Sequence, residues 1–547
     1  MTNRDVAEAF NELADLMELH EADEFRVRSY RSAYLTLRKV ERPLSELTDA
    51  EIQTFRGIGP AITKKIRELL STGKLKILEQ LRQQTPPGVL EMLRINGFGP
   101  KKVRVVWREM GITDIGELWY ACNENRLIAT KGFGLKTQEA LKNQLEYYLR
   151  SREQLHYPTA EAAADFVGAW LSGRLSGALV APTGEIRRCC PVIRHLDLLV
   201  GYDGALTPAL QGEALVVERI ENDVYYLKLE GQTPLRLFHC RADQFGLRLF
   251  ETTGSPQFVQ AFFSAFPQLK GASLRSEREV FEKVGLPFIA PELREDASSI
   301  DLAKKDALPE LITEADIRGI LHVHTHWSDG LHALRETCLY AREQGYDYIG
   351  ITDHSQSAFY ANGLKPERVL AQMEEIDALN AEWASFRILK GIESDILSDG
   401  SLDYEEAVLK KFDFVIASVH SNLNMSQEKA TQRLLRAIEN PYTTILGHPT
   451  GRLLLSRPGY PIDWDAVFEA CARRGVAIEL NANPHRLDLD WTLIPKALQY
   501  GVRISINPDA HSKEAIHDLR YGVMAARKGG LSVRHCLNAS KTLLEKL

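Results

Sequence analysis

The chain has 547 residues, a formal net charge of −7 and 44% hydrophobic residues, a composition typical of a globular protein with roughly three or four domains. No segment reaches the roughly 18 uninterrupted apolar residues of a membrane span, and the N-terminus has no apolar run fit for a signal peptide. Seven scattered cysteines form no CxxC pair, which indicates a reducing compartment. We therefore expect a cytoplasmic protein without a membrane partner.

Charge and histidine are unevenly distributed along the chain. Residues 51–110 contain twelve Lys/Arg and five Asp/Glu, whereas eleven of the fifteen histidines follow residue 315. A locally basic segment favours contact with nucleic acid, and a histidine-rich region favours metal binding. The two ends of the chain are thus expected to have different functions.

Three segments of the N-terminal part repeat one pattern, Gly-apolar-Gly followed by a partly basic helical run. They are FRGIGPAITKKIREL (55–69), INGFGPKKVRVVWREM (95–110) and TKGFGLKTQEALKNQ (130–144). The glycines permit a tight turn between two helices, and the second helix then begins with free backbone N–H groups that suit a phosphate. One copy alone would fit a plain packing corner equally well.

The pattern resembles the helix-hairpin-helix motif, which binds the nucleic-acid backbone without reading sequence. Three copies with adjacent lysines predict DNA binding, in a nucleoid-associated protein. Lys65 fits either a phosphate contact or a Schiff-base amine acting on an abasic sugar. The predicted DNA-binding residues are Gly57, Gly59, Lys64, Lys65, Gly97, Gly99, Lys101, Lys102, Gly132 and Gly134.

The layout of the whole chain resembles the bacterial and archaeal family X DNA polymerases that carry a C-terminal PHP domain. This resemblance implies a multidomain fold: a helical helix-hairpin-helix region, an α/β nucleotidyltransferase-like palm with a thumb, and a distorted (β/α)7 PHP barrel. The expected boundaries are an 8-kDa-like domain at 1–85, a fingers-like region at 86–150, palm and thumb at 151–290, a linker at 291–313 and the PHP domain at 314–547. We expect the proline-containing stretch 286–310 to be an extended connector.

The palm of this family holds two Mg²⁺ ions on an Asp-x-Asp pair and a third Asp, and these positions differ here. The strand-like segment VIRHLDLLVGYDG (192–204) carries His195 and Asp197 on one face, and the third position matches Arg236. The preceding Gly-Ser is Gly184-Glu185, and the thumb asparagine is Val259. One carboxylate beside an imidazole and a guanidinium cannot replace the hard oxygen ligands that two Mg²⁺ ions need. We therefore expect a degenerate polymerase site at His195, Asp197 and Arg236.

The C-terminal region alternates short apolar runs with helical stretches, and polar residues follow the apolar runs. Seven such runs between residues 319 and 511 predict a barrel of the β/α type, whose active site lies at the strand carboxyl ends. A single histidine of this kind is ordinarily a core or surface residue, but nine residues at successive strand ends predict a multinuclear metal centre. They are His322, His324, Asp329, His354, Glu393, His420, His448, Asp509 and His511.

These nine positions match the PHP family residue by residue. The resemblance implies three divalent ions, Zn²⁺ or Mn²⁺, and hydrolysis of phosphoesters by a metal-bound water held by Glu393, His322 and His324. We expect His326, His332, His485 and His517 to be non-ligands. Arg452 and Arg520 fit either a phosphate contact or a surface salt bridge.

Together these features predict a DNA-end-processing phosphoesterase, a 3′–5′ exonuclease or 3′-end-cleaning enzyme of DNA repair, with gapped DNA or DNA 3′ ends as its partner. Polymerase activity is expected to be lost. Two alternatives remain: a gap-filling polymerase with rearranged metal ligands, and a non-catalytic DNA-binding scaffold.

Overall fold

The computed structural model describes residues 3–38, 40, 42–95, 97–128, 130, 132–150, 154–210, 215–229, 233–383 and 385–539. The chain forms two compact units, one of residues 1–123 and 127–149, the other of residues 124–126 and 150–547. Asn96 and Lys131, within two of the predicted hairpin segments, lie outside the described residues. Of the helices described, none has the length and apolarity that crossing a membrane requires.

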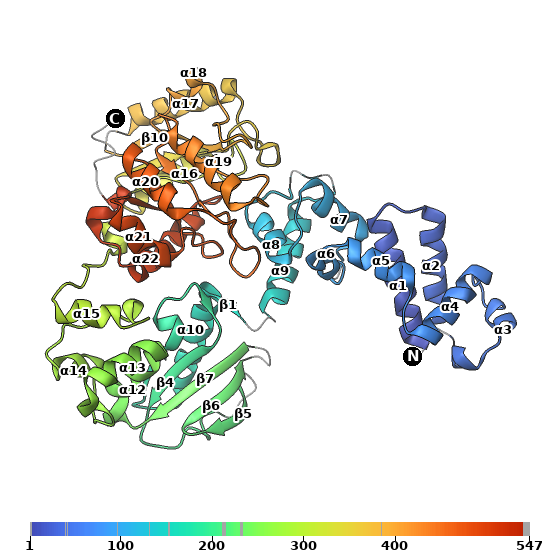
Figure 1. Ribbon diagram of the computed structural model, residues 1–547, viewed down its shortest axis with the longest axis horizontal. Coiled ribbons are helices and arrows are strands. Elements are labelled where there is room, and N and C mark those ends of the chain that lie inside the picture. Colours follow the sequence, from blue (N-terminus) through green and yellow to red (C-terminus); the bar gives the residue numbers. More distant parts are fainter. Residues whose placement is uncertain are drawn as a thin grey trace. The chain divides into compact units, whose positions relative to one another are not determined.

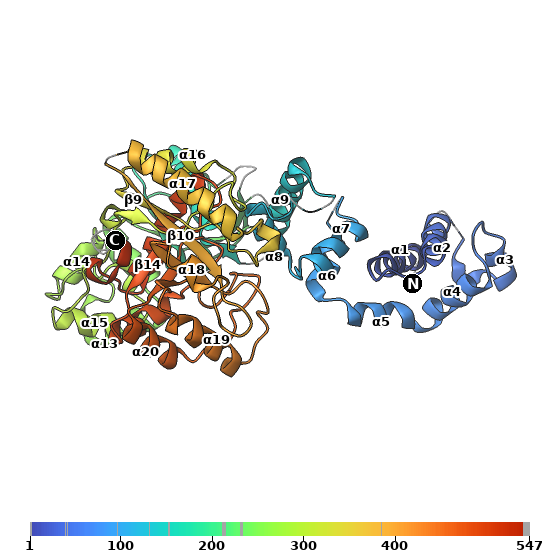
Figure 2. The same cartoon turned by 90° about the horizontal axis from the view of Figure 1, so that it is seen from above.

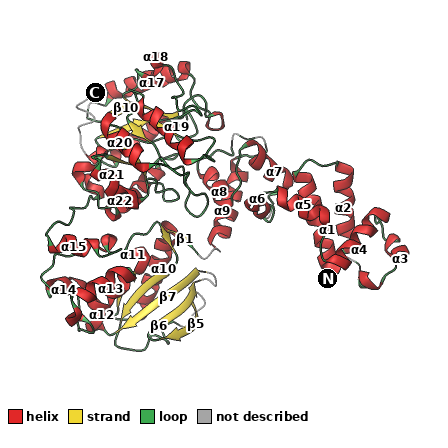
Figure 3. Ribbon diagram, viewed as in Figure 1, coloured by secondary structure: helices red, strands yellow, loops and turns green. Residues whose placement is uncertain are grey.

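The first unit is built from helices joined by short loops (Figures 1 and 3). Its core consists of apolar side chains that recur on one face of each amphipathic helix. In the first helix these are Val6, Phe10, Leu13 and Met17. The helices are α1 (Asn3–Leu19), α2 (Glu24–Leu37), α3 (Asp49–Gln53), α4 (Pro60–Thr72), α5 (Lys76–Gln84), α6 (Pro87–Met92), α7 (Pro100–Arg104), a π-helical turn (Val105–Glu109), α8 (Ile115–Asn123) and α9 (Leu135–Arg150).

Three turns of this unit, which precede α4, α7 and α9, share one hydrogen-bond pattern. In each, the buried apolar residue between two glycines donates its N–H to the carbonyl three residues earlier, from Ile58 to Phe55, from Phe98 to Ile95 and from Phe133 to Thr130. The glycine before each apolar residue has positive φ, +80° at Gly57, +74° at Gly97 and +96° at Gly132, a conformation that residues with a Cβ avoid. The three repeated segments therefore form three equivalent helical hairpins.

The middle of the chain forms a five-stranded sheet in the order β2-β4-β7-β6-β5, with α10 packed on one face (Figures 1 and 3). Leu198, Val200 and Leu237 point from the sheet into the core beneath α10. The elements are β1 (Leu155–His156), α10 (Tyr157–Arg174), β2 (Leu179–Thr183), α11 (Gly184–Arg187), β3 (Val192–Ile193), β4 (Leu196–Gly201), β5 (Leu215–Glu221), β6 (Val224–Leu229) and β7 (Thr233–Cys240).

A helical layer with a phenylalanine-rich core follows, formed by α12 (Phe245–Thr253), α13 (Pro256–Ala265) and α14 (Glu277–Glu282). The stretch 286–310 differs from the extended connector that we expected. It contains helix α15 (Ser298–Lys304), and the buried side chains of Ile289, Ile300 and Ala303 join the same core. These apolar residues make the segment part of a packed layer, despite its prolines.

The C-terminal region is a nearly closed barrel of seven parallel strands in sequential order, β8 to β14, with helices around it (Figures 1 and 2). The strands are β8 (Gly319–Ile320), β9 (Tyr348–Ile351), β10 (Arg387–Asp395), β11 (Phe414–Ser418), β12 (Ile445–Leu446), β13 (Ala477–Asn481) and β14 (Ile504–Asn507). The helices are α16 (Leu334–Glu343), α17 (Pro366–Glu382), α18 (Glu406–Leu409), α19 (Gln427–Glu439), α20 (Trp464–Arg474), α21 (Ile494–Gln499) and α22 (Leu519–Lys528).

The first and last strands of the barrel meet just beyond their carboxyl ends. Val323 bridges to Ala510 in parallel register, His324 N donates to Ala510 O, and Ala510 N donates to His322 O. The segments after β8 and β14 are thereby joined, and the residues that follow all seven strands face one end of the barrel.

Arg294 in the layer before the barrel is fully buried, and its guanidinium contacts the Glu277 carboxylate at 2.5 Å. We expect Arg294→Ala to lower the free energy of unfolding by about 3–5 kcal/mol, because it breaks a buried ion pair. Chemical denaturation followed by fluorescence measures this change. The exposed Arg275→Ala is the matched control, and equal stability of the two variants would contradict the expectation.

Candidate metal centre

A single buried carboxylate lies at the middle of the open end of the barrel. Glu393, on β10, is 1% exposed, and its oxygens lie 2.9–3.6 Å from imidazole nitrogens of five histidines. These histidines follow β8, β9, β11 and β12, and they are His322, His324, His354, His420 and His448. Histidines that follow four strands thus converge on the carboxylate of a fifth strand.

The remaining predicted ligands lie beside this cluster. Asp509 Oδ1 is 3.4 Å from His322 Nε2 and 3.1 Å from His324 Nε2. Asp329 Oδ2 is 3.5 Å from both His354 Nε2 and His511 Nε2. Among the described residues, three groups have ligand atoms close enough together to hold an ion: His324, Asp329, His354 and His511; His322, His324 and Asp509; and His354, Glu393 and His420.

Many polar atoms of this cluster are buried without a hydrogen-bond partner, although buried polar atoms are nearly always paired. His354 Nδ1 and Glu393 Oε2, for example, lie 2.9 Å apart but are not aligned as a hydrogen bond. Converging imidazole and carboxylate atoms of this kind are the ligands that Zn²⁺ and Mn²⁺ take. The unpartnered atoms are His322 Nε2, His324 Nδ1, Asp329 Oδ2, His354 Nδ1, Glu393 Oε2, His448 Nδ1 and His511 Nε2.

Within the cluster, the carboxylates and the imidazoles shift one another's pKa values. Burial would lower the pKa of His420, but Glu393 and Asp395 raise it to about 10. Burial likewise opposes protonation of His511, and Asp329 raises its pKa to about 10. Burial would raise the Glu393 pKa, but the neighbouring histidines hold it well below its ordinary value. Without a cation, protons on the imidazoles compensate the buried carboxylates.

Two further carboxylates orient the histidines, and the sequence reasoning missed both. Glu479, on β13, lies 2.7 Å from His322 Nδ1. Asp395 contacts His420 Nδ1 and also accepts a hydrogen bond from Ser357 Oγ at 2.8 Å. The available signals were a lone acid inside the apolar strand VAIELNAN for Glu479, and a position two residues after Glu393 on the same strand for Asp395.

Both predicted phosphate contacts are engaged in ion pairs. Arg452 contacts Asp490 and donates to the carbonyls of residues 486 and 487. Arg520 Nη2 lies 2.7 Å from Glu161 Oε2. The salt-bridge alternative therefore describes both arginines. The four histidines expected to be non-ligands, His326, His332, His485 and His517, lie outside the three candidate groups. His448, one of the nine predicted ligands, also lies outside them, although its Nε2 is 2.9 Å from Glu393 Oε1.

In the middle sheet, an arginine has direct contact with the remaining palm acid. Asp197 on β4 and Arg236 on β7 are register partners, and two guanidinium nitrogens lie 2.7 Å from the two carboxylate oxygens. Asp197 is 3% exposed. Gly184 packs against the same carboxylate, because a Cβ there would lie 2.3 Å from Asp197 Oδ2. The hydrogen bond to Asp197 raises the Arg236 pKa, which keeps the guanidinium charged.

The residues at the other palm positions, His195, Glu185 and Val259, belong to none of the candidate metal groups either. His195 is exposed and lies directly before β4, whereas Asp197 is buried in that strand. Glu185 Oε2 accepts a hydrogen bond from Arg194 N at 2.6 Å. Val259 packs against the phenylalanine-rich core. Over the described residues, the candidate metal groups all belong to the barrel.

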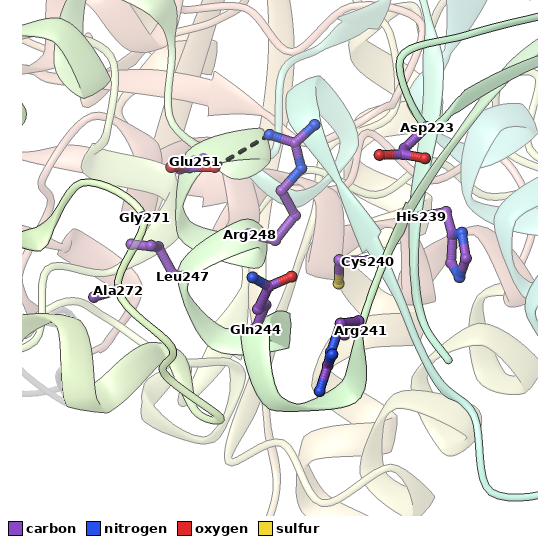
Figure 4. Close-up of a pocket in the computed structure, with 10 residues that line it drawn as sticks. All are labelled: Asp223, His239, Cys240, Arg241, Gln244, Leu247, Arg248, Glu251, Gly271 and Ala272. Carbon is purple, nitrogen blue, oxygen red and sulfur yellow. Dashed lines mark hydrogen bonds and ion pairs between the residues drawn. The ribbon is translucent and has the colours of Figure 1, made fainter. Parts of the chain in front are cut away.

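A separate hollow of about 480 Å³ lies at the carboxyl end of β7, where His239, Cys240 and Arg241 line it (Figure 4). Arg248 reaches towards it and contacts Glu251 at 3.1 Å, while Arg241, also in its lining, contacts Asp243 at 3.2 Å. Both arginine charges are therefore already balanced by an adjacent carboxylate.

The predicted DNA-binding residues lie at the hairpins of the first unit. Lys64 and Lys65 are in the first turns of α4, and Lys101 and Lys102 are in α7. Lys64 and Lys101 are exposed, and the helices begin with proline directly after Gly59 and Gly99. Charge and backbone N–H groups are thus presented at the start of each helix.

Comparison with known proteins supports the assignment of the N-terminal helical hairpins and of the C-terminal barrel. A helix-hairpin-helix domain model matches residues 1–75, and a PHP domain model matches residues 321–483. The chain is 35% identical to the DNA polymerase/3′-5′ exonuclease PolX of Bacillus subtilis over 98% of each protein. A probable phosphatase of Caldanaerobacter subterraneus is 33% identical over 36% of this chain and 77% of its own length. A probable phosphatase of a Thermoanaerobacter species is 29% identical over 40% of this chain and 90% of its own length.

The pKa shifts of the cluster predict how the thermal stability of the metal-free protein depends on pH. His420 and His511 have folded pKa values of about 10, above the value of about 6.5 for an unfolded chain, so their stabilising contribution is complete below pH 6.5 and is lost as pH rises through 10. In EDTA, the Tm of the barrel should therefore fall between pH 7 and pH 10, as measured by differential scanning calorimetry.

The fall in Tm should be smaller in a His420→Asn, His511→Asn double variant. His517→Asn, which removes a histidine bonded to Tyr340 outside the cluster, should retain the wild-type dependence. The expectation fails if the double variant and His517→Asn lose stability equally with pH.

Proposed function

Since the chain belongs to the family X DNA polymerases that carry a C-terminal PHP domain, we propose that it processes DNA ends by metal-dependent hydrolysis in that domain. The observation that supports this most directly is the set of unpartnered, buried imidazole and carboxylate atoms around Glu393. In this proposal, residues 1–85 and 86–150 bind DNA, residues 151–290 are an inert palm and thumb, and residues 314–547 hydrolyse the substrate.

Three divalent ions, Zn²⁺ or Mn²⁺, are proposed for the three candidate groups, which contain eight of the nine predicted ligands, and the ninth, His448, lies 2.9 Å from Glu393. When bound, such ions generate a nucleophilic hydroxide near neutral pH and stabilise charge on the leaving oxygen. Glu393 belongs to one of the three candidate groups, with His354 at one of its oxygens and His420 at the other, and would help to hold an ion there. His322 and His324 supply neutral nitrogen ligands, and Asp329 and Asp509 supply charge on either side. This division of ligands supports hydrolysis of a phosphoester.

DNA 3′ ends are the proposed substrate. The relative from Bacillus subtilis is named a 3′-5′ exonuclease, and the shorter relatives are named probable phosphatases. Cleavage of a terminal phosphodiester and removal of a terminal phosphate need the same attack on phosphorus, so one centre can perform both. In this proposal, the hairpins contact the DNA backbone independently of sequence, so the protein can process gaps or 3′ ends in DNA of any sequence.

We propose further that the palm adds no nucleotides. The observation behind this is the bidentate Asp197–Arg236 pair, because a guanidinium keeps its positive charge where two Mg²⁺ ions would need carboxylate oxygens. The rival function, a gap-filling polymerase with rearranged ligands, requires a second acid facing Asp197. Glu185 is the nearby candidate, and its carboxylate is already bonded to the backbone of Arg194.

Glu393→Gln should remove bound metal and 3′-end hydrolysis together, because it replaces a charged oxygen that faces five imidazoles. We expect activity on a 3′-labelled oligonucleotide to fall at least about 100-fold, the upper end of the cost of losing a supporting group. Metal content by elemental analysis is measured in the same samples. Glu367→Gln, exposed on α17, is the matched control, and hydrolysis that survives in Glu393→Gln would place the chemistry elsewhere.

Replacing Lys64, Lys65, Lys101 and Lys102 by alanine should weaken DNA binding equally for all sequences. Each lost phosphate contact should reduce the slope of log affinity against log salt by about 0.9 on duplex DNA. Fluorescence anisotropy with gapped DNA at several salt concentrations measures the slope. An alanine variant of the exposed Lys304, Lys305, Lys410 and Lys411 loses the same charge outside the hairpins, and an identical change in both variants would refute the assignment.

A further inference from the structure

Six of the seven barrel strands carry or lead into the nine candidate ligands, and β13 is the exception. In place of a ligand, β13 carries Glu479, which is 0% exposed. Its carboxylate lies 2.7 Å from His322 Nδ1, and it also accepts a hydrogen bond from the backbone N–H of His448 at 2.7 Å. One buried carboxylate therefore contacts two candidate ligands that come from two other strands.

The groups that face Glu479 are all hydrogen-bond donors when His322 is protonated on Nδ1. Oε1 faces His322 Nδ1 and the side-chain nitrogen of Asn507, at 2.9 Å. Oε2 faces the N–H of His448 and, at 3.4 Å, the side-chain nitrogen of Asn481. A carboxylate accepts at both oxygens and has no donor of its own when ionised, so this environment selects Glu at position 479.

The hydrogen bond fixes which nitrogen of His322 is available for a cation. Because Nδ1 donates to Glu479, the lone pair of the neutral ring lies on Nε2. That nitrogen is buried without a hydrogen-bond partner and lies 3.4 Å from both Glu393 Oε1 and Asp509 Oδ1. The lone pair is thus directed at the carboxylates that would share an ion with it.

We propose that Glu479 is a positioning residue of the metal centre, which sets the tautomer of His322 and fixes the backbone of His448 relative to it. The inference rests on the proposed function, since it assumes that His322 and His448 hold an ion. It goes beyond the nine-residue set, because Glu479 itself donates no ligand atom to the three candidate groups. Supporting carboxylates of this kind typically raise metal affinity about 10- to 100-fold.

Glu479→Gln tests the tautomer directly, because an amide is isosteric with a carboxylate but must present an NH₂ on one side. If the NH₂ faced His448, it would meet a backbone N–H that cannot reverse its role. The NH₂ should therefore face His322 and Asn507, whose ring and amide can adapt. His322 would then accept at Nδ1 and carry its proton on Nε2, where the cation should bind.

The experiment measures Mn²⁺ and Zn²⁺ binding to the full-length protein, without DNA, by isothermal titration calorimetry and elemental analysis. We expect Glu479→Gln to lose affinity for one ion by about 10- to 100-fold, with Glu479→Asp falling less because it retains an acceptor. Glu479→Gln should remain folded in EDTA, with a Tm below that of wild type because the substitution removes a carboxylate beside the protonated His322 ring. Glu469→Gln, exposed on α20, is the matched control and should bind as wild type does.

Nitrogen-15 spectra of the metal-free protein give a second readout that needs neither metal nor activity. Although burial opposes protonation, Asp509, Glu479 and Glu393 raise the pKa of His322 well above its ordinary value, so the spectra are recorded at an alkaline pH at which the ring is neutral. Wild type should then show a resonance of a ring protonated on Nδ1 that is absent from His322→Asn, and Glu479→Gln should convert it to the tautomer protonated on Nε2. The proposal is overturned if Glu479→Gln keeps wild-type affinity and tautomer, or if it loses metal only because the chelated protein unfolds. If wild type binds no divalent ion, the proposed function itself fails, whereas normal wild-type binding with an unaffected Glu479→Gln removes this inference alone.

Discussion

The C-terminal barrel depends on a carboxylate that would be very costly to bury alone. Glu393 is nearly inaccessible, and an isolated charge in that position would lose several kcal/mol of hydration. Five imidazoles compensate it, and they come from segments that only the closed barrel brings together. Strand order, closure at Val323 and Ala510, and the chemistry at the open end are therefore linked by one electrostatic requirement.

The palm also buries a carboxylate, but a different kind of group compensates its charge. Asp197 is also buried, but its partner is the guanidinium of Arg236. An imidazole can lose its proton near neutral pH and offer the freed nitrogen to a cation, whereas a guanidinium keeps its proton and has no lone pair to offer. The barrel imidazoles can thus offer lone pairs to a cation once they lose their protons, whereas the Arg236 guanidinium beside Asp197 offers none. This difference supports a chain with one hydrolytic centre on a polymerase-like scaffold.

Much of this arrangement was predictable from residue patterns, because polar residues after apolar runs at regular spacing leave few alternatives to a β/α barrel. The nine candidate ligands converge for that reason, eight of them in the three candidate groups and His448 against Glu393. The three glycine turns recur because positive φ selects glycine. Position 236 could be matched to the palm pattern, but its direct contact with Asp197 depends on strand register, which the sequence does not specify.

Other features depended on packing that no local pattern reveals. The stretch 286–310 has the prolines and mixed charge of a connector, yet Ile289, Ile300 and Ala303 are buried in a core that they share with the preceding helices α12, α13 and α14. Glu479 resembles any isolated acid in a strand, and only the closed barrel places it against His322 and His448. The spacing of His195 and Asp197 did not reveal that only Asp197 is buried, since β4 begins directly after His195.

The central claim is that this chain shortens DNA 3′ ends and does not extend them. The most direct measurement follows a 5′-labelled primer at a one-nucleotide gap, incubated with the full-length protein, Mn²⁺ and all four dNTPs, so that both reactions are read on one gel. The account predicts products shorter than the primer, or primers with a terminal phosphate removed, and none longer. A longer product that requires dNTPs and disappears in Asp197→Ala would contradict it, because the palm would then be catalytic despite Arg236.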